Sequence, residues 1–241
     1  SYDVGNTSGV GILRELELNA QGFESDEILE SAHAGENVTN TFGQGAVDFI
    51  RSHHADVNPF FLYVSFTTPH GPIHNSPDFN DPRIATLSGK RKQYASMVLT
   101  MDKEIGRILN RLDDPNGDND NSDAIADNTL VIFINDNGGA RNNGTVNTPL
   151  RNWKGSPFEG GIRIPMILAG AGIAPVRRGA TYTAPVHTID LAATAVIAGG
   201  GNFDNNDPID GINLLPYINN EKAGIPHQYI IMRSAADVGI R

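Results

Sequence analysis

Apolar runs and amphipathic segments alternate along most of this sequence. Residues 60–66 (FFLYVSF) and 129–134 (TLVIFI) are short apolar runs bounded by Pro or Asn. Runs of this length with such boundaries favour strands that are buried on both faces over buried helices. Residues 164–169 (IPMILA) and 229–233 (YIIMR) predict two further strands.

Three segments carry the helical spacing of apolar residues instead. The clearest helix covers about residues 90–112, and the charged Lys103 and Glu104 lie off its apolar stripe. A second helix begins near residue 37, where Asn37 or Thr39 can cap it, and a third covers residues 188–198 with Asp190 in its first turn. The stripe of the first helix consists of Tyr94, Met97, Val98, Met101, Ile105, Ile108 and Leu112, and that of the second consists of Val38, Phe42, Ala46, Phe49 and Ile50.

Strands that alternate with helices predict an α/β fold. Right-handed crossovers would build a mostly parallel (mixed) central sheet with helices on both faces. The sequence shows no internal repeat and no linker, so we expect a single domain over residues 1–241. Residues 1–36 predict an irregular lead-in with at most one short strand or helix, and the turn-rich residues 204–241 are expected to begin a C-terminal part.

The amino-acid composition excludes several classes of partner and of chemistry. The 241 residues include 18 Lys and Arg against 28 Asp and Glu, a formal net charge of −10. Because nucleic-acid binding relies on clustered cations, this balance argues against a nucleic-acid partner. No run approaches the roughly 18 apolar residues of a membrane span, and there is no cysteine for a disulfide or a nucleophile. The chain begins with Ser1, which we interpret as a fragment boundary, and no pattern indicates an oligomeric state.

Asp136 and Asn137 closely follow the apolar run at residues 129–134. Carboxylate and amide oxygens are ligands that Ca²⁺ and Mg²⁺ prefer, and neighbouring positions at a strand end can both face one ion. The same Asp-Asn-Gly-Gly sequence also fits a turn, because Asn and Gly tolerate positive φ. Spacing alone leaves the metal site and the turn equally open.

Two histidines and a lysine are further candidates. His70 follows the run at residues 60–66, at an edge where α/β sheets place their sites. A solvated loop histidine is the alternative for His70, and it applies more strongly to His74. Lys154 can meet an anionic oxygen as a compact positive charge, or it is a plain surface lysine.

Two polar segments are interpreted as structural. Residues 114–118 have the spacing of an EF-hand calcium loop, but the glycine is out of place and the final Glu ligand is missing, which favours a solvated loop. Residues 159–165 predict a backbone hairpin in which Arg163 pairs with Glu159.

In their order along the chain, these segments resemble the sulfatase family of the alkaline-phosphatase-like superfamily. The resemblance covers roughly residues 38–233. The matching segments are residues 59–66 followed by 69–72, then 94–112, 128–133 followed by 136–139, 154–155, 158–165, 187–191 and 210–216.

The resemblance implies a sulfuric ester hydrolase that acts on a sulfated small molecule or a sulfated carbohydrate. In that family a formylglycine attacks the sulfur, and a divalent cation, Ca²⁺ or else Mg²⁺, binds the sulfate oxygens. By resemblance, Asp136 and Asn137 are metal ligands, and His70 donates a proton to the leaving oxygen. Lys154 binds the sulfate and stabilises the same oxygen. His74 and Arg141 are candidate contacts to a sugar, and the family implies a periplasmic, secreted or lysosomal location.

The nucleophile region of that family is missing from this sequence. The sequence contains no cysteine and no Ser-x-Pro-x-Arg motif from which a formylglycine is made, and it lacks the upstream Asp-Asp and Lys-x-His pairs. We therefore expect the 241 residues alone to show little or no sulfatase activity and to bind metal weakly. The alternatives are a phosphonate or phosphate monoester hydrolase of the same superfamily, and a non-catalytic relative that binds an anion or a cation.

Overall fold

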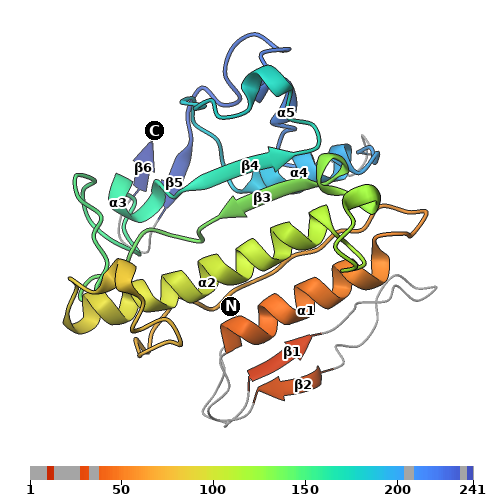
Figure 1. Ribbon diagram of the computed structural model, residues 1–241. Helices are drawn as coiled ribbons and strands as arrows, with labels where there is room; N and C mark the ends of the chain where they lie inside the picture. The colour runs from red at the N-terminus through yellow and green to blue at the C-terminus, as the bar shows by residue number, and fades with distance from the viewer. Residues whose placement is uncertain (1–9, 14–27, 33–37, 204–208, 234–237, 241) are drawn as a thin grey trace. The chain divides into compact units, whose positions relative to one another are not determined.

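The computed structural model describes residues 10–13, 28–32, 38–203, 209–233 and 238–240 (Figure 1). The chain divides into two compact units, residues 1–123 and 124–241. Each unit contains both helices and strands, which confirms the mixed α/β character. The predicted cap at Asn37 and residues 204–208 of the turn-rich segment lie outside the described residues. One domain over the whole chain stays a prediction.

Two long helices form the core of the first unit. Helices α1 (Val38–His53) and α2 (Gly89–Asp113) pack side by side (Figure 1). Both were predicted from their apolar stripes, and both predictions are confirmed. The residues of these helices that bury apolar side chains are Ala46, Val47, Ile50, Met97 and Leu112.

Glu104 of α2 differs from the prediction that it lies off the packed face. Its side chain is only 4% exposed, and it accepts hydrogen bonds from Asn40 Nδ2 (3.2 Å) and Arg107 Nη1 (2.6 Å). A Cβ added to Gly43 of α1 would lie 2.0 Å from Glu104 Oε2, so the glycine makes room for the carboxylate. A buried carboxylate is tolerated because these partners replace the water it loses. An apolar stripe cannot predict such a polar contact between helices.

Strands β1 (Val10–Leu13) and β2 (Ile28–Ala32) lie in the segment that was predicted to be an irregular lead-in. They pair antiparallel, with Val10 opposite Ala32. Each strand satisfies the backbone polar groups of the other. Four or five residues carry too little periodic pattern to predict such a pair from the local sequence.

Residues 60–66 form no strand in this structure, so the strand predicted there is not observed. The segment packs one side against α1, where the ring of Phe60 meets Phe49 edge to face at 5.7 Å between centroids. Its other side is open, with Phe61 75% and Tyr63 76% exposed. The physical reason is that no described strand hydrogen-bonds to this segment, so its apolar sequence does not become a buried strand.

Strands β3 (Leu130–Ile134) and β4 (Met166–Gly170) lie in the second unit (Figure 1). Both were predicted, but they pair antiparallel, with Ile132 opposite Leu168. All three strand pairs among the described residues are antiparallel, whereas the alternating pattern predicted a mostly parallel sheet. Between β3 and β4 the chain forms only loops and the four-residue helix α3 (Glu159–Ile162), which is not the crossover helix that a parallel pair needs.

The rest of the second unit contains short elements. Helix α4 (Ile189–Ala198) confirms the predicted third helix, and β5 (Ile231–Arg233) falls within the strand predicted at residues 229–233. Helix α5 (Leu215–Ile218) lies between them in sequence, and β6 (Val238–Ile240) pairs antiparallel with β5. Short 3₁₀ turns occupy Pro82–Ile84, Asn121–Asp123, Ala126–Asn128 and Pro175–Arg177. The described helices include none with the length and apolarity to cross a membrane.

Candidate functional site

Residues 135–139, called here the ligand loop, leave β3 and carry the two predicted metal ligands. Asp136 is exposed, and its Oδ1 accepts the backbone N–H of Asn137 at 2.9 Å. Asn137 Nδ2 donates to the carbonyl of Gly138 at 3.0 Å. In the described part of the chain, Asp136 Oδ2 and Asn137 Oδ1 accept no hydrogen bond. One oxygen on each side chain is therefore available to a cation.

The glycines of the ligand loop, Gly138 and Gly139, allow other segments to pack closely against it, and neither adopts a positive φ. The N–H of Gly138 donates to the carbonyl of Gly161 at 2.9 Å, and an added Cβ on Gly138 would lie 1.9 Å from the carbonyl oxygen of Gly160. A Cβ on Gly160 would in turn lie 2.1 Å from the carbonyl oxygen of Asn152. The ligand loop, the segment before Lys154 and helix α3 thus pack backbone against backbone.

Lys154 lies beside the ligand loop. Its backbone N–H donates to the carbonyl of Gly139 at 3.1 Å, and its side chain is exposed. The ammonium makes no ion pair or hydrogen bond with any described residue. An ammonium without a carboxylate partner is available to an anion, and this arrangement suits the predicted role.

Asn147 belongs to the same site, although the sequence did not identify it. Its carboxamide hydrogen-bonds to Gly139, Asn152 and Gly160, which belong to three separate parts of the connection between β3 and β4. A half-buried Asn in a polar loop has no distinguishing pattern, so only the distances reveal its partners.

Two arginines of this unit have different surroundings. Arg141 is exposed and makes no hydrogen bond or ion pair with a described residue, so its role as a sugar contact stays a prediction. Arg163 Nη1 lies 3.1 Å from Glu159 Oε2, which confirms the predicted pair. The pair spans one helical turn because these residues open and follow helix α3, so the predicted hairpin is wrong.

His70 and His74 lie in the first unit. His70 Nδ1 is 2.9 Å from the carbonyl oxygen of Gly71, and His74 Nδ1 is 3.0 Å from that of Pro72. A carbonyl oxygen only accepts, so each Nδ1 carries a hydrogen and donates it, and neither Nε2 makes a hydrogen bond with a described residue. Both side chains are exposed, which leaves the Nε2 atoms accessible.

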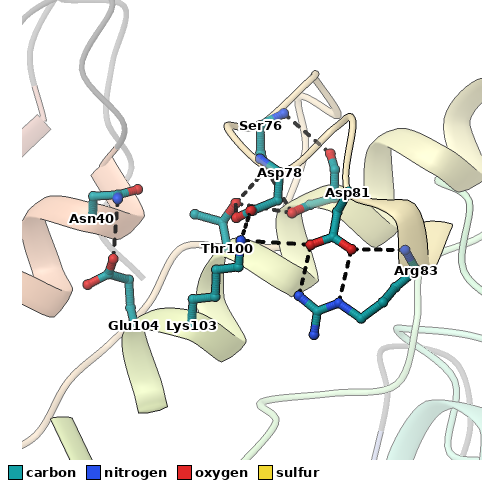
Figure 2. Close-up of polar contacts among 9 residues, drawn as sticks. Asn40, Ser76, Asp78, Asp81, Arg83, Thr100, Lys103 and Glu104 are labelled. Carbon is teal, nitrogen blue, oxygen red and sulfur yellow. Dashed lines mark hydrogen bonds and ion pairs between the residues drawn. The ribbon is translucent and has the colours of Figure 1, made fainter. Parts of the chain in front are cut away.

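The loop that follows His74 is fastened to α2 by polar contacts (Figure 2). Ser76 Oγ donates to the carbonyl of Ser96 at 2.7 Å, and Thr100 Oγ1 donates to Asp78 Oδ2 at 2.7 Å. Lys103 of the same helix forms an ion pair with Asp78. These contacts fix the loop to α2, whereas His70 and His74, which precede it, are exposed.

Asp81 forms a second part of this network (Figure 2). Arg83 Nε and Nη2 donate to its two carboxylate oxygens at 3.0 and 2.9 Å, and the Arg83 backbone N–H donates to Oδ1 at 2.9 Å. These hydrogen bonds, the side-chain ones first, hold the pKa of Asp81 well below its usual range, and the same contact raises the pKa of Arg83. The pair therefore stays charged at ordinary pH.

The Asp- and Asn-rich loop after α2 uses its carboxylates for its own backbone. Asp114 Oδ1 accepts the N–H groups of Gly117 (2.7 Å) and Asp118 (3.1 Å), and its Oδ2 accepts the N–H of Asn119 (3.1 Å). These bonds give Asp114 a structural role in the loop.

The donor set of the ligand loop fits Ca²⁺ or Mg²⁺ in kind but not in number. Asp136 and Asn137 offer hard oxygens, whereas Ca²⁺ takes about six to eight oxygen ligands. No group of three or more His, Cys, Asp or Glu that could hold a metal occurs within the described ranges. The two side chains are too few to complete a metal shell, and their role as metal ligands stays a prediction.

Comparison with known proteins identifies the family of this chain. The sulfatase family model matches residues 13–201. A sulfatase of Formosa agariphila is 40% identical over 168 residues, which are 68% of this chain and 30% of that protein. The N-acetylgalactosamine-6-sulfatase of Homo sapiens is 32% identical over 220 residues, 89% of this chain and 38% of that protein. The chain thus spans well under half the length of these curated relatives.

Solved structures show a similar fold. The crystal structure of Ps i-CgsB in complex with k-i-k-neocarrahexaose matches 89% of this chain and 48% of that chain, with a TM-score of 0.71 and 30% identity. The family match covers the ligand loop, Lys154 and His70 in one continuous range. The chain belongs to the sulfatase family.

Proposed function

We propose that this chain is the part of a sulfuric ester hydrolase that holds two metal ligands and the sulfate-binding lysine. The observation that carries the proposal is the hydrogen bond from Lys154 N–H to Gly139, which holds the lysine beside the loop of Asp136 and Asn137. A free ammonium and two free oxygen ligands at one place suit an anionic ester bound together with a cation.

The side chains have separate roles in this proposal. Cleavage of the ester leaves negative charge on the departing oxygen, which the Lys154 ammonium stabilises. By its resemblance to the family, His70, whose side chain is exposed, is the proposed proton donor to that oxygen. A bound divalent cation would add positive charge against the sulfate oxygens.

No residue of this chain can become the formylglycine that attacks the sulfur in this family. A formylglycine requires a Cys or Ser in the family motif, and the sequence contains no cysteine and no Ser-x-Pro-x-Arg. We derive no attack step from these residues. In the proposal, the nucleophile and the remaining metal ligands come from sequence outside these 241 residues.

A sulfated carbohydrate is the proposed substrate class. Two observations support it: one relative is named an N-acetylgalactosamine-6-sulfatase, and the solved structure of Ps i-CgsB contains a neocarrahexaose. Exposed His74 and Arg141 are the proposed sugar contacts. The proposal includes a periplasmic, secreted or lysosomal location, since polymeric sugars are met outside the cytoplasm, and fractionation of the producing cells would test it.

We also propose that residues 60–66 become a strand of a mostly parallel sheet in the product of the complete gene, called the full-length protein from here on. The support is the extended apolar segment whose Phe61 and Tyr63 are 75% and 76% exposed. Such rings favour a covered position. Slow amide hydrogen exchange at residues 60–66 of the full-length protein is the expected result, and fast exchange would count against the strand.

Hydrolysis by the full-length protein tests the function. We expect turnover of 4-nitrophenyl sulfate and much slower turnover of 4-nitrophenyl phosphate and of a phosphonate monoester. In Lys154→Ala we expect kcat to fall by roughly 100- to 1,000-fold, the usual effect of removing one charge-stabilising group. Lys222→Ala is the matched control, because Lys222 is an exposed lysine of the same unit whose ammonium lies over the ring of Tyr217 and pairs with no described carboxylate.

The other results have distinct meanings. Faster turnover of the phosphate or phosphonate ester would favour the esterase alternative of the same superfamily. Binding of sulfated sugar without turnover of any ester would favour the non-catalytic relative. Equal kcat in Lys154→Ala and the wild type would remove Lys154 from the proposed site.

A further inference from the structure

Asn147 joins three segments of the connection between β3 and β4. Its Oδ1 accepts the N–H of Gly139 at 3.2 Å, and its Nδ2 donates to the carbonyl of the same residue at 3.0 Å. The same Nδ2 lies 3.1 Å from the carbonyl oxygen of Asn152 and 3.0 Å from that of Gly160. One half-buried side chain thus contacts the ligand loop, the segment before Lys154 and helix α3.

The chemistry of these contacts fixes the orientation of the carboxamide. Three carbonyl oxygens, which only accept, surround Nδ2, and a backbone N–H faces Oδ1. A flipped amide would place its oxygen against all three carbonyls. Since Nδ2 carries two hydrogens, two of the three carbonyls share one of them.

The residues that Asn147 contacts stand next to the proposed functional groups. Gly139 follows Asn137 by two positions, and its carbonyl also accepts the N–H of Lys154 at 3.1 Å. The carbonyl of Gly160 lies against Gly138, where no Cβ fits. The carboxamide therefore lies at the junction between the segment that carries the metal ligands and the segment that carries the lysine.

We propose that Asn147 is a positioning residue, which holds the ligand loop and Lys154 at a fixed separation for the sulfate. This inference rests on the proposed function. Asn147 itself is not a ligand in this proposal, because its oxygen and its N–H groups all face backbone atoms. Its effect reaches the reaction through Asp136, Asn137 and Lys154, and small misplacements of such groups have large effects on rate.

The substitution Asn147→Asp tests the hydrogen bonds of the side chain without changing its size. The substitution keeps the size of the side chain and the oxygen that faces Gly139 N–H. It replaces Nδ2 by an oxygen that faces three carbonyls, so attraction becomes repulsion. We expect the Kd for Ca²⁺ to rise by roughly tenfold to 100-fold, as for other groups that orient metal ligands. We expect kcat for 4-nitrophenyl sulfate to fall by roughly 100-fold.

The matched control is Asn220→Asp. Asn220 is exposed and follows helix α5, so this variant makes the same change of charge away from the junction. Its Kd for Ca²⁺ and its kcat are expected to equal those of the wild type. Calorimetry with Ca²⁺ and steady-state kinetics of the full-length protein supply both readouts, at a temperature at which circular dichroism shows each variant to be folded.

Wild type and Asp136→Ala, measured in parallel, separate this inference from the proposed function. If the wild type hydrolyses the sulfate ester and Asp136→Ala loses Ca²⁺ affinity, the proposed function stands. Unchanged Kd and kcat in a folded Asn147→Asp protein would then overturn the positioning role alone. The proposed function fails if the wild type does not hydrolyse the ester and Asp136→Ala binds Ca²⁺ as tightly as the wild type. In that case the positioning role fails with it.

A second variant covers the case in which Asn147→Asp does not fold. Asn147→Ala removes all the side-chain hydrogen bonds without adding charge. In this variant we expect the amide of Gly139, which loses its acceptor, to exchange its hydrogen at least tenfold faster, together with a lower kcat. Faster exchange with unchanged kcat would show a merely structural role and overturn the proposal, as would unchanged exchange.

Discussion

The backbone N–H of Lys154 donates a hydrogen bond to the carbonyl oxygen of Gly139 over 3.1 Å. The contact is made by main chain, so it holds the lysine beside the ligand loop while leaving the ammonium free. Such a hydrogen bond stabilises the folded chain by about 1 kcal/mol. Its larger consequence is geometric, because a movement of the loop also moves the lysine.

Gly138→Ala is expected to destabilise the full-length protein by about 2 to 3 kcal/mol. The added Cβ would lie 1.9 Å from the carbonyl oxygen of Gly160, which is backbone and cannot rotate away. Denaturation in urea measures the loss. Gly45→Ala in α1 is the matched control, since its Cβ meets nothing within 4 Å, and a gain of about 0.5 to 1 kcal/mol is expected there. Equal stability of Gly138→Ala and wild type would contradict the close packing.

Asp81 predicts a specific pH dependence of stability. Hydrogen bonds from Arg83 lower the pKa of the folded carboxyl below its ordinary value of 3.8. A lowered folded pKa means that the stabilisation is complete above the unfolded pKa and is lost as the pH falls through the folded pKa. The stability difference between wild type and Asp81→Asn should therefore be constant above about pH 5 and shrink below about pH 4.

Urea denaturation at several pH values checks the Asp81 prediction. Asp113→Asn is a suitable control, because Asp113 is exposed at the end of α2 and its side chain makes no hydrogen bond or ion pair with a described residue. Its stability difference from wild type is expected to stay small at every pH. A difference for Asp81→Asn that persists unchanged through the acid range would rule out the inferred pKa direction.

Asp190→Ala is expected to lower the free energy of unfolding by about 3 kcal/mol or more. The Asp190 side chain is fully buried. It accepts hydrogen bonds from the backbone N–H of His187 (2.8 Å) and of Ile212 (3.1 Å), and it lies 2.8 Å from His227 Nε2. Removing the carboxylate leaves these buried donors without an acceptor. Urea denaturation measures the effect, and the exposed Asp210→Ala is expected to change stability by less than about 0.5 kcal/mol.

The 241-residue chain by itself is expected to hydrolyse 4-nitrophenyl sulfate no faster than buffer does. The side chains present bind and polarise an anion but offer no activated nucleophile. A colorimetric assay with and without added Ca²⁺ measures the rate. Hydrolysis that disappears in Lys154→Ala would show that this chain contains a nucleophile after all.

Predictions that depend on the local sequence succeeded, whereas those that depend on contacts between residues distant in the sequence did not. Helices α1 and α2 repeat an apolar stripe over many turns, so the sequence predicted both. Residues 60–66 have equally apolar sequence, but a strand also needs a partner, and none of the described strands pairs with them. Glu104 was placed off the packed face because the apolar stripe carries no information about Asn40 and Arg107.

In the candidate site, too, the sequence identified residues by their type and order but not by their contacts in the folded chain. The oxygen ligands and the lysine were identified by residue type and by their order along the chain, and the family match covers them. Their roles stay predictions. Asn147 was missed because its importance lies in contacts to Gly139, Asn152 and Gly160, which the loop brings together only when folded.

The sequence by itself determined helices α1, α2 and α4, strands β3, β4 and β5, the family, and the absence of the formylglycine motif from this chain. These features depend on local periodicity and on residue identity, which are present before folding. Only the tertiary structure decided the antiparallel pairing of β3 with β4, the burial of Glu104 and the contact of Lys154 with Gly139. Each of these joins residues that are distant in sequence, and hydrogen bonding between distant segments depends on distances that only the folded chain defines.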